Sequence, residues 1–334
     1  MTNERKKSVV VLGGGTGIHS ILRGLKKYHE AIGVTAVVNM SDSGGSTGRL
    51  RDEFGQLPMG DVRMALIALA RESNQQDKLL RELFLHRFDK GNGLYGHNFG
   101  NLFMTALTEM LGDEANAVKA ASNLLQVRGT VLPVTVDNIH LVAEYDDGMV
   151  LEGEHLIDEP SSDRYGHKIV KLSSNPVGKI SSEAKVAIEQ ADLIVLGPGD
   201  LYSSLISILI IDGVSDAIKN SQAELLYNVN LMTRPGQTDD FGLFEHVEEI
   251  VKYADKHPDY ISFNSAKLDP KLLKHYARKN QFPVEFNRAP EYGEILKQDL
   301  LSQEPVQQRK GDTIKRSLLR NDGDKFAKVI LSLL

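Results

Sequence analysis

The fold is decided close to the N-terminus, where a short apolar strand runs directly into a cluster of glycines: Val9-Val10-Val11-Leu12-Gly13-Gly14-Gly15-Thr16-Gly17. A strand that ends in glycines and a small hydroxyl residue, and then opens a helix, presents free backbone N–H groups at the positive end of the helix dipole. Glycine lets this backbone come within hydrogen-bonding distance of a phosphate, because no Cβ stands in the way. The stretch therefore predicts a phosphate-binding loop at the end of a strand in a parallel sheet.

A second stretch of the same kind follows less than thirty residues later: Val37-Val38-Asn39-Met40-Ser41-Asp42-Ser43-Gly44-Gly45-Ser46-Thr47-Gly48-Arg49. Two such loops side by side indicate a nucleotide or a phosphorylated metabolite as ligand. The alternative is that each glycine-rich turn only connects a strand to a helix, and this interpretation is weaker for two loops than for one.

Neither loop matches a common nucleotide-binding motif. When the dinucleotide pattern G-x-G-x-x-G is read from Gly13, its last position is Ile18, and no acidic residue is well placed to hold a ribose after the second strand. The second loop carries Arg49 where a Walker loop needs lysine. The sequence therefore predicts phosphate binding by a route that neither motif describes.

Composition narrows the class of protein. The chain has 334 residues, 41% of them hydrophobic, which is enough for one large core. The formal net charge of −6 and the scattered basic residues disfavour a nucleic-acid partner. The chain has no cysteine, which excludes disulfides and thiolate metal sites. No stretch is apolar for long enough to form a signal peptide or to insert into a membrane, so we expect a cytoplasmic protein.

The pattern of apolar residues predicts a Rossmann-like, doubly wound α/β fold with a mostly parallel sheet. Runs rich in Val, Ile or Leu, typical of strands covered on both faces, occupy 8–12, 34–39, 192–196 and 224–229. Helical patterns occupy 17–28, 61–72, 77–87, 99–111, 114–125, 182–190, 201–211 and 324–334. Residues 131–136, 139–145 and 149–151 read as a small antiparallel β excursion. We expect a single domain over 1–334, with 129–172 as a small β subdomain or insertion within it.

Two polar clusters follow the second loop. Asp61 stands at a predicted N-cap, and a carboxylate near bound phosphates is a natural magnesium ligand. The alternative for Asp61 is a simple helix cap. Further on, His97 and Asn101 lie four residues apart at the start of a helix, where they would share one face and point toward a ligand.

Two more strand ends carry polar residues. Gly197-Pro198-Gly199-Asp200-Leu201-Tyr202 follows one buried strand, and Asn230 to Gly236, which includes Thr233 and Arg234, follows the next. Ligands of open α/β sheets bind at the carboxyl ends of the strands, near the point where strand order reverses, so these segments should converge there. Arg234 could pair with a phosphate, whereas Asp200 would repel one unless it faces away or binds a metal.

Taken together and in order, these motifs resemble the CofD-like superfamily, and within it the gluconeogenesis factor (YvcK-like) family. The resemblance rests on both glycine loops and on the segments Gly60-Asp61-Val62-Arg63, Gly96-His97 with Gly100-Asn101, Gly197-Pro198-Gly199 with Leu201-Tyr202, Met232-Thr233 with Pro235-Gly236, and Arg320 with Asp322. The chain departs from the family pattern at Met64, Asp200 and Asn321.

The resemblance implies a Rossmann-like fold and a cytosolic regulatory protein that binds a nucleotide or UDP-sugar, with UDP-N-acetylglucosamine or NAD as ligand. It also implies a role in growth on gluconeogenic carbon sources and in cell shape, and a homodimer. The enzymatic branch implies an alternative function, a magnesium-dependent 2-phospho-L-lactate transferase-like enzyme acting on a nucleoside diphosphate ester. A nicotinamide oxidoreductase is weaker, because the dinucleotide pattern is irregular.

The predicted ligand contacts come from the four strand ends and the two polar clusters, and no catalytic residue is assigned. They are Gly14, Gly15, Thr16, Asn39, Asp42, Ser43, Gly44, Gly45, Ser46, Asp61, His97, Asn101, Gly197, Pro198, Gly199, Tyr202, Asn230 and Thr233, with Asp42 and Asp61 as candidate Mg²⁺ ligands.

Overall fold

The structure is a computed structural model that describes residues 5–303 and 317–334. Its centre is a seven-stranded, all-parallel sheet with the order β10-β9-β8-β7-β1-β2-β3. Its strands are β1 (Lys7–Gly13), β2 (Ile32–Val38), β3 (Thr130–Pro133), β7 (Leu193–Leu196), β8 (Glu224–Asn228), β9 (Tyr260–Asn264) and β10 (Glu294–Gln298). The central strands are apolar along most of their length and buried, as strands covered on both faces must be.

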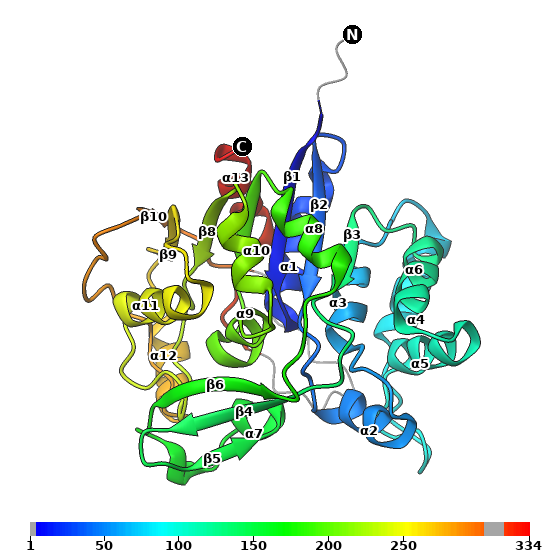
Figure 1. Cartoon of the computed structure of the whole chain (residues 1–334), viewed down its shortest axis with the longest axis horizontal. Coiled ribbons are helices and arrows are strands. Elements are labelled where there is room, and N and C mark those ends of the chain that lie inside the picture. Colours follow the sequence, from blue (N-terminus) through cyan, green and yellow to red (C-terminus); the bar gives the residue numbers. More distant parts are fainter. Residues whose placement is uncertain (1–4, 304–316) are drawn as a thin grey trace.

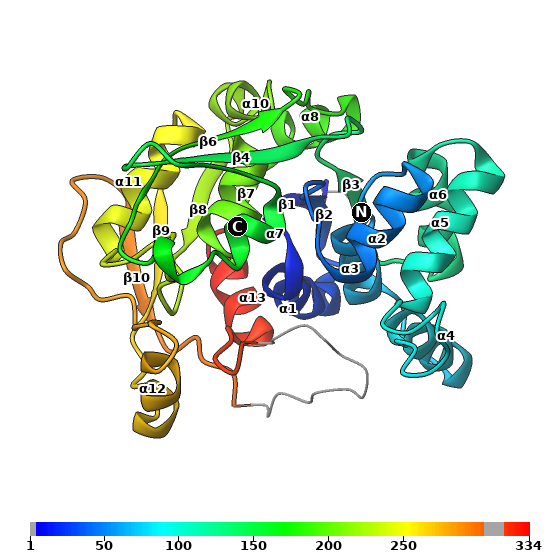
Figure 2. The same cartoon turned by 90° about the horizontal axis from the view of Figure 1, so that it is seen from below.

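Helices cover both faces of this sheet. Seen from below, α1 (Gly15–Leu25), α3 (Gly60–Leu69) and α13 (Gly323–Ser332) lie on one face, whereas α8 (Ser182–Glu189), α10 (Val214–Asn220) and α11 (Leu243–Ala254) lie on the other (Figure 2). The remaining helices are α2 (Gly45–Phe54), α4 (Gln75–Leu85), α5 (Phe99–Leu111), α6 (Glu114–Leu124), α7 (Glu154–Asp158), α9 (Ser207–Leu209) and α12 (Pro270–Ala277), with a π-helical segment at Leu201–Ile206 and 3₁₀ turns at Lys26–Tyr28 and Ser162–Arg164.

A second sheet is small and antiparallel. It has the order β5-β4-β6, with β4 (His140–Tyr145), β5 (Val150–Glu152) and β6 (Ile169–Asn175). This sheet and α7 lie below the carboxyl ends of the main strands (Figure 1). Residues 131–136, which the sequence pattern assigns to the antiparallel excursion, behave differently, because β3 pairs in parallel with β2 and forms an edge of the main sheet.

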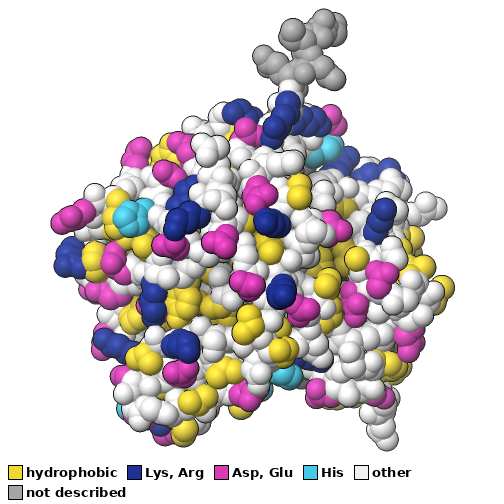
Figure 3. Space-filling view, in the orientation of Figure 1, with side chains coloured by type: hydrophobic (Ala, Val, Ile, Leu, Met, Phe, Trp, Pro, Cys, Tyr) yellow, Lys and Arg dark blue, Asp and Glu magenta, His cyan; other side chains and the backbone are white. Residues whose placement is uncertain are grey.

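The charged side chains on one face of the surface are mixed in sign, and the helices that the structure describes are not of the membrane-spanning kind. On the face seen in Figure 3, basic and acidic side chains are interspersed rather than separated into patches of one sign. Among residues 5–303 and 317–334, no helix combines the length and the apolar character that crossing a membrane requires.

Candidate functional site

The candidate site lies at the topological switch point of the main sheet, where the order of the strands reverses. From β1 the chain moves to β2 and β3 on one side, whereas β7, β8, β9 and β10 follow on the other, so the switch point falls between β1 and β7. The glycine loops after β1, β2 and β7 all end at this edge of the sheet. A crevice at such a point is where open α/β sheets bind ligands.

Asp61 is held against the first glycine loop. It is the second residue of α3 and not the N-cap that the sequence predicts, because α3 begins one residue earlier and Met59 takes that place. Its Oδ1 accepts a hydrogen bond of 2.8 Å from the backbone N–H of Gly15. A Cβ on Gly14 would collide with Asp61 Oδ2, so glycine at this position is what lets the carboxylate lie so close to the loop.

Asp42 comes from the second glycine loop and lies next to the start of α3. Its Oδ1 accepts a hydrogen bond of 2.8 Å from the N–H of Gly44, and its Oδ2 would be 2.7 Å from a Cβ built on Gly60. Asp42 and Asp61 are both only partly buried. The loop after β2 and the start of α3 therefore bring two carboxylates to one edge of the sheet.

The environment of these carboxylates favours their protonated forms. Burial, together with the negative charge of Asp42, raises the pKa of Asp61 from 3.8 to about 7. Burial also raises the pKa of Asp42, even though Gly44 and Thr47 donate hydrogen bonds to it. A divalent cation would relieve both effects, since carboxylate oxygens are the ligands that Mg²⁺ prefers. Asp42 and Asp61 are therefore the residues that could hold a magnesium ion.

A third carboxylate reaches this site from the small sheet. Glu154, at the start of α7, accepts a weak hydrogen bond of 3.4 Å from the N–H of Ser43, and the N–H of His155 donates to Ser43 Oγ at 3.0 Å. Burial and the charges of Asp42 and Asp158 raise the pKa of Glu154 well above its ordinary value. Glu154 is not predictable from the sequence, because nothing in the pattern around it indicates that α7 folds back over the second loop.

The second and third glycine loops are tied together across β1. Asn39 Nδ2 donates to the carbonyl of Ser203 at 3.0 Å, and Ser203 Oγ donates to Asp158 Oδ1 at 3.0 Å. Asn230 Nδ2 donates to the carbonyl of Gly199 at 2.8 Å, which joins the loop after β8 to the same assembly. The segments that the sequence predicts to converge do lie together at this edge.

Asp200 and Arg234 neutralise one another. Two nitrogens of the Arg234 guanidinium bind the Asp200 carboxylate, at 3.0 and 2.5 Å, and Asp158 lies 3.6 Å from the same group. Burial alone would raise the pKa of Asp200, but Arg234 outweighs burial and holds this pKa below its ordinary value. Asp200 therefore does not present a free negative charge to a phosphate, and Arg234 already has carboxylate partners.

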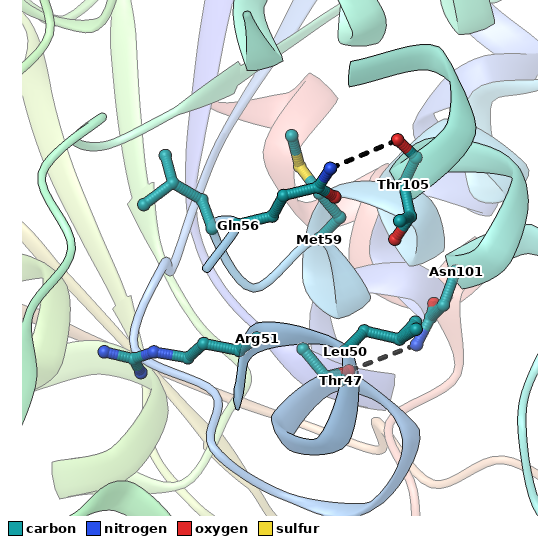
Figure 4. A pocket seen from close by; sticks show the side chains of 8 residues that line it. Thr47, Leu50, Arg51, Gln56, Met59, Asn101 and Thr105 are labelled. Carbon is teal, nitrogen blue, oxygen red and sulfur yellow. Dashed lines mark hydrogen bonds between the residues drawn. The ribbon is translucent and has the colours of Figure 1, made fainter. Parts of the chain in front are cut away.

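His97 and Asn101 contact residues at the end of the second glycine loop. Helix α5 begins at Phe99 with Asn98 as its cap, so His97 precedes the helix, and its Nδ1 lies 3.2 Å from Ser46 Oγ. Burial lowers the pKa of His97. Asn101 donates to Thr47 at 3.2 Å (Figure 4) and accepts from Arg63.

The cavity drawn in Figure 4 lies between α2 and α5, among Thr47, Leu50, Arg51, Gln56, Met59, Asn101 and Thr105. It has a volume of about 10 Å³, room for a single water at most. A nucleotide cannot enter it. The cavity marks the packing of α2 on α5, which fixes the second glycine loop in place.

Three further residues that the sequence predicts to contact the ligand, Tyr202, Thr233 and Thr16, differ in burial and in hydrogen bonding. Tyr202 is fully buried, and its hydroxyl donates to the carbonyl of Ile169 at 3.3 Å. Thr233 is buried and bonds through both its N–H and its Oγ1 to Phe282. Thr16 is exposed in the first turn of α1. The hydrogen-bonding groups of Tyr202 and Thr233 are thus already used within the protein.

An all-parallel sheet with helices on both faces, and with glycine-bearing loops gathered at its switch point, defines a Rossmann-like α/β protein. The sequence profile of the CofD family, described as 2-phospho-L-lactate transferase CofD, matches residues 9–301. The chain belongs to the CofD family.

Relatives and a solved structure agree with this assignment. The chain is 34% identical over 333 residues to the gluconeogenesis factor of Bacillus subtilis strain 168, covering 99% of both proteins. It is 39% identical over 282 residues to the gluconeogenesis factor of Halalkalibacterium halodurans, covering 84% of each. The crystal structure of a UPF0052 family protein from Bacillus halodurans superposes with a TM-score of 0.87 at 35% identity, covering 98% of this chain and 100% of that one.

Proposed function

We propose that the protein is a regulatory protein of the gluconeogenesis factor type that binds a nucleotide or UDP-sugar through its diphosphate. UDP-N-acetylglucosamine and NAD are the candidate ligands. The name gluconeogenesis factor, which its relatives carry, supports a role in gluconeogenesis. Growth on gluconeogenic carbon sources and normal cell shape are the processes that we propose it serves.

The pair of carboxylates Asp42 and Asp61 beside the first two glycine loops carries this proposal. A diphosphate cannot approach two carboxylates directly, because like charges repel. A magnesium ion held by Asp42 and Asp61 reverses that repulsion. The N–H groups of Gly15, Ser43 and Gly44 already bind carboxylates, so the phosphate oxygens would meet the remaining backbone N–H groups of the two loops. Burial and the charge of Asp42 raise the pKa of Asp61, and a bound cation would offset both effects.

Calorimetry on the purified protein tests the proposal. UDP-N-acetylglucosamine and NAD are titrated with Mg²⁺ and, separately, with EDTA, at modest salt. At least one of them should bind below millimolar concentration with Mg²⁺ and weaken by about tenfold or more in EDTA. If neither ligand binds under either condition, the proposed function is wrong.

The description of the family supports a second candidate, a magnesium-dependent transferase acting on a nucleoside diphosphate ester. Such a transfer proceeds largely by positioning and charge stabilisation, so it needs no dedicated nucleophile. Incubation with a deazaflavin acceptor, an activated phospholactate and Mg²⁺ tests this reaction. Turnover would establish the enzyme, whereas intact ligand binding without turnover favours the regulatory protein.

A further inference from the structure

One buried side chain at the same edge of the sheet has no partner for either of its polar atoms. Asn228, the last residue of β8, is 1% exposed, and both its Nδ2 and its Oδ1 are buried without a hydrogen-bond partner. Other orphaned polar atoms occur in the protein, but within residues 5–303 and 317–334 no other side chain has two of them. Buried amides in folded proteins are almost always satisfied, so this one requires a partner.

The group beside Asn228 is also unsatisfied. Ser262 of β9 pairs with Asn228 in the parallel ladder, so the two side chains project from the same face of the sheet. Ser262 is fully buried, and its Oγ has no partner either. Asn230, two residues beyond Asn228, keeps a buried and unpaired Oδ1. We call these three side chains the polar cluster; Asn228 ends β8, Ser262 lies beside it in β9, and Asn230 follows β8.

The polar cluster lies at a defined distance from the phosphate loops. β7 separates β8 from β1, and adjacent strands are about 4.8 Å apart, so the end of β8 is roughly 10 Å from the first glycine loop. The carbonyl of Asn228 would lie 3.3 Å from a Cβ built on Gly197, so the cluster adjoins the third glycine loop directly. A nucleoside diphosphate is long enough to span these two strand spacings with its phosphates at one end.

We propose that Asn228, supported by Ser262, binds the nucleobase of the ligand. An amide offers a donor and an acceptor side by side, and this pattern is complementary to the edge of a base that also carries both, such as the imide edge of uracil. The phosphates of the ligand belong at the magnesium ion that Asp42 and Asp61 would hold, and its uncharged hydrogen-bonding edge belongs at Asn228. This inference rests on the proposed function, because it assigns the other end of the same ligand.

The test separates the two ends of the ligand with two probes, UDP and inorganic pyrophosphate, each titrated calorimetrically in Mg²⁺. Asn228→Leu keeps the side-chain size and removes both polar atoms. It should weaken UDP binding about tenfold and leave pyrophosphate binding unchanged. Ser262→Ala is a smaller change that disturbs folding less, and it should weaken UDP binding about threefold. Thermal melting of each variant confirms that it is folded.

Tyr227→Phe is the matched control. Tyr227 adjoins Asn228 in β8, its hydroxyl is likewise buried without a partner, and its side chain lies on the opposite face. This variant should bind UDP like the parent.

Several results would overturn the inference. Unchanged UDP binding in both Asn228→Leu and Ser262→Ala would mean that buried water alone satisfies these atoms. Equal weakening of UDP and pyrophosphate would indicate a general distortion. Weakening confined to UDP-N-acetylglucosamine, with UDP unaffected, would assign Asn228 to the sugar and not to the base. A parent protein that binds pyrophosphate but not UDP contradicts this inference alone, whereas one that binds no nucleotide and no pyrophosphate contradicts the proposed function itself.

Discussion

At the scale of single residues, Asp61 determines how stability depends on pH. Its pKa is about 7 in the folded protein and near 3.8 when unperturbed, so the folded state retains a proton that the unfolded state has lost. Stability therefore falls as pH rises from about 4 to 7. Asp61→Asn should abolish this loss and be about 2 kcal/mol more stable than the parent at pH 8, a discounted value because the carboxylate is partly exposed. Urea unfolding at pH 4 and pH 8 measures it.

The same substitution should act in the opposite direction on binding. The amide oxygen introduced by Asp61→Asn would still accept the hydrogen bond of Gly15, but an uncharged amide holds Mg²⁺ poorly. Nucleotide affinity in Mg²⁺ should therefore fall at least tenfold, about 1.4 kcal/mol. Asp163→Asn, on the exposed turn before Arg164, is the control and should leave affinity unchanged. An Asp61→Asn protein that is less stable at pH 8 and binds normally would contradict both assignments.

Two substitutions at Gly45 distinguish the effect of backbone strain from the loss of a ligand contact. It has a φ of +50° and open space around its Cβ position, so a β-branched residue there is strained even though nothing obstructs it. Gly45→Val should lose both stability and affinity. Gly45→Asn should keep most of the stability, since asparagine tolerates this conformation, and should still bind at least tenfold more weakly if a phosphate approaches the loop.

Melting and binding curves on the same preparations distinguish these effects. Ser161→Val, in the exposed turn before Arg164, serves as the neutral reference for both measurements. If the Gly45→Asn protein is stable and binds the nucleotide as tightly as the parent does, the second loop does not contact the phosphate.

At the scale of elements, Arg234 joins the loop after β8 to α7. Its guanidinium contacts Asp200 and Asp158, and Gln237 donates to the carbonyl of Ile157 at 2.9 Å. Arg234→Met leaves two carboxylates without their cation and should destabilise the protein by about 3 kcal/mol. Hydrogen exchange over 153–160 should accelerate, because α7 loses one of its attachments to the main sheet.

A double variant provides the control for this prediction. Arg234→Met combined with Asp200→Asn removes the uncompensated charge and should recover more than half of the lost stability. No recovery would show that Arg234 contributes by packing and not by charge.

Element by element, the sequence predicted the four central strands of the main sheet well and the strands toward its two edges poorly. The strands β1, β2, β7 and β8 are continuous apolar runs, which only burial on both faces explains. β9 and β10 were missed because they mix polar and apolar residues and lie toward the edge, where burial no longer dictates composition. β3 was assigned to the wrong sheet, because an edge strand and a hairpin strand share the same local pattern.

The candidate site also contains residues that the sequence predicts and residues that it does not. The meeting of the glycine loops, with Asp42, was predictable, because they sit at strand ends that the parallel topology brings together. Asp61 stands at the start of α3, and the sequence indicated only that it follows the second loop closely. Glu154 and Asn228 were not predictable, since α7 folds over the site by tertiary contacts, and the missing partners of Asn228 exist only in three dimensions.

For the molecule as a whole, we propose that the switch point of the sheet holds a divalent cation between the second loop and α3, and that this cation binds a diphosphate. The small sheet encloses the same point from below, through α7 (Figure 1). Charge, topology and loop composition therefore converge on one place in the fold.

The most direct measurement is a crystal structure of the protein with UDP and Mn²⁺ in place of Mg²⁺, read by anomalous scattering. The account predicts one manganese peak in coordination distance of the carboxylates of Asp42 and Asp61 and of the diphosphate oxygens, roughly 2.1 Å from each ligand oxygen. A diphosphate bound at this edge without metal, or a manganese ion away from both carboxylates, would contradict it.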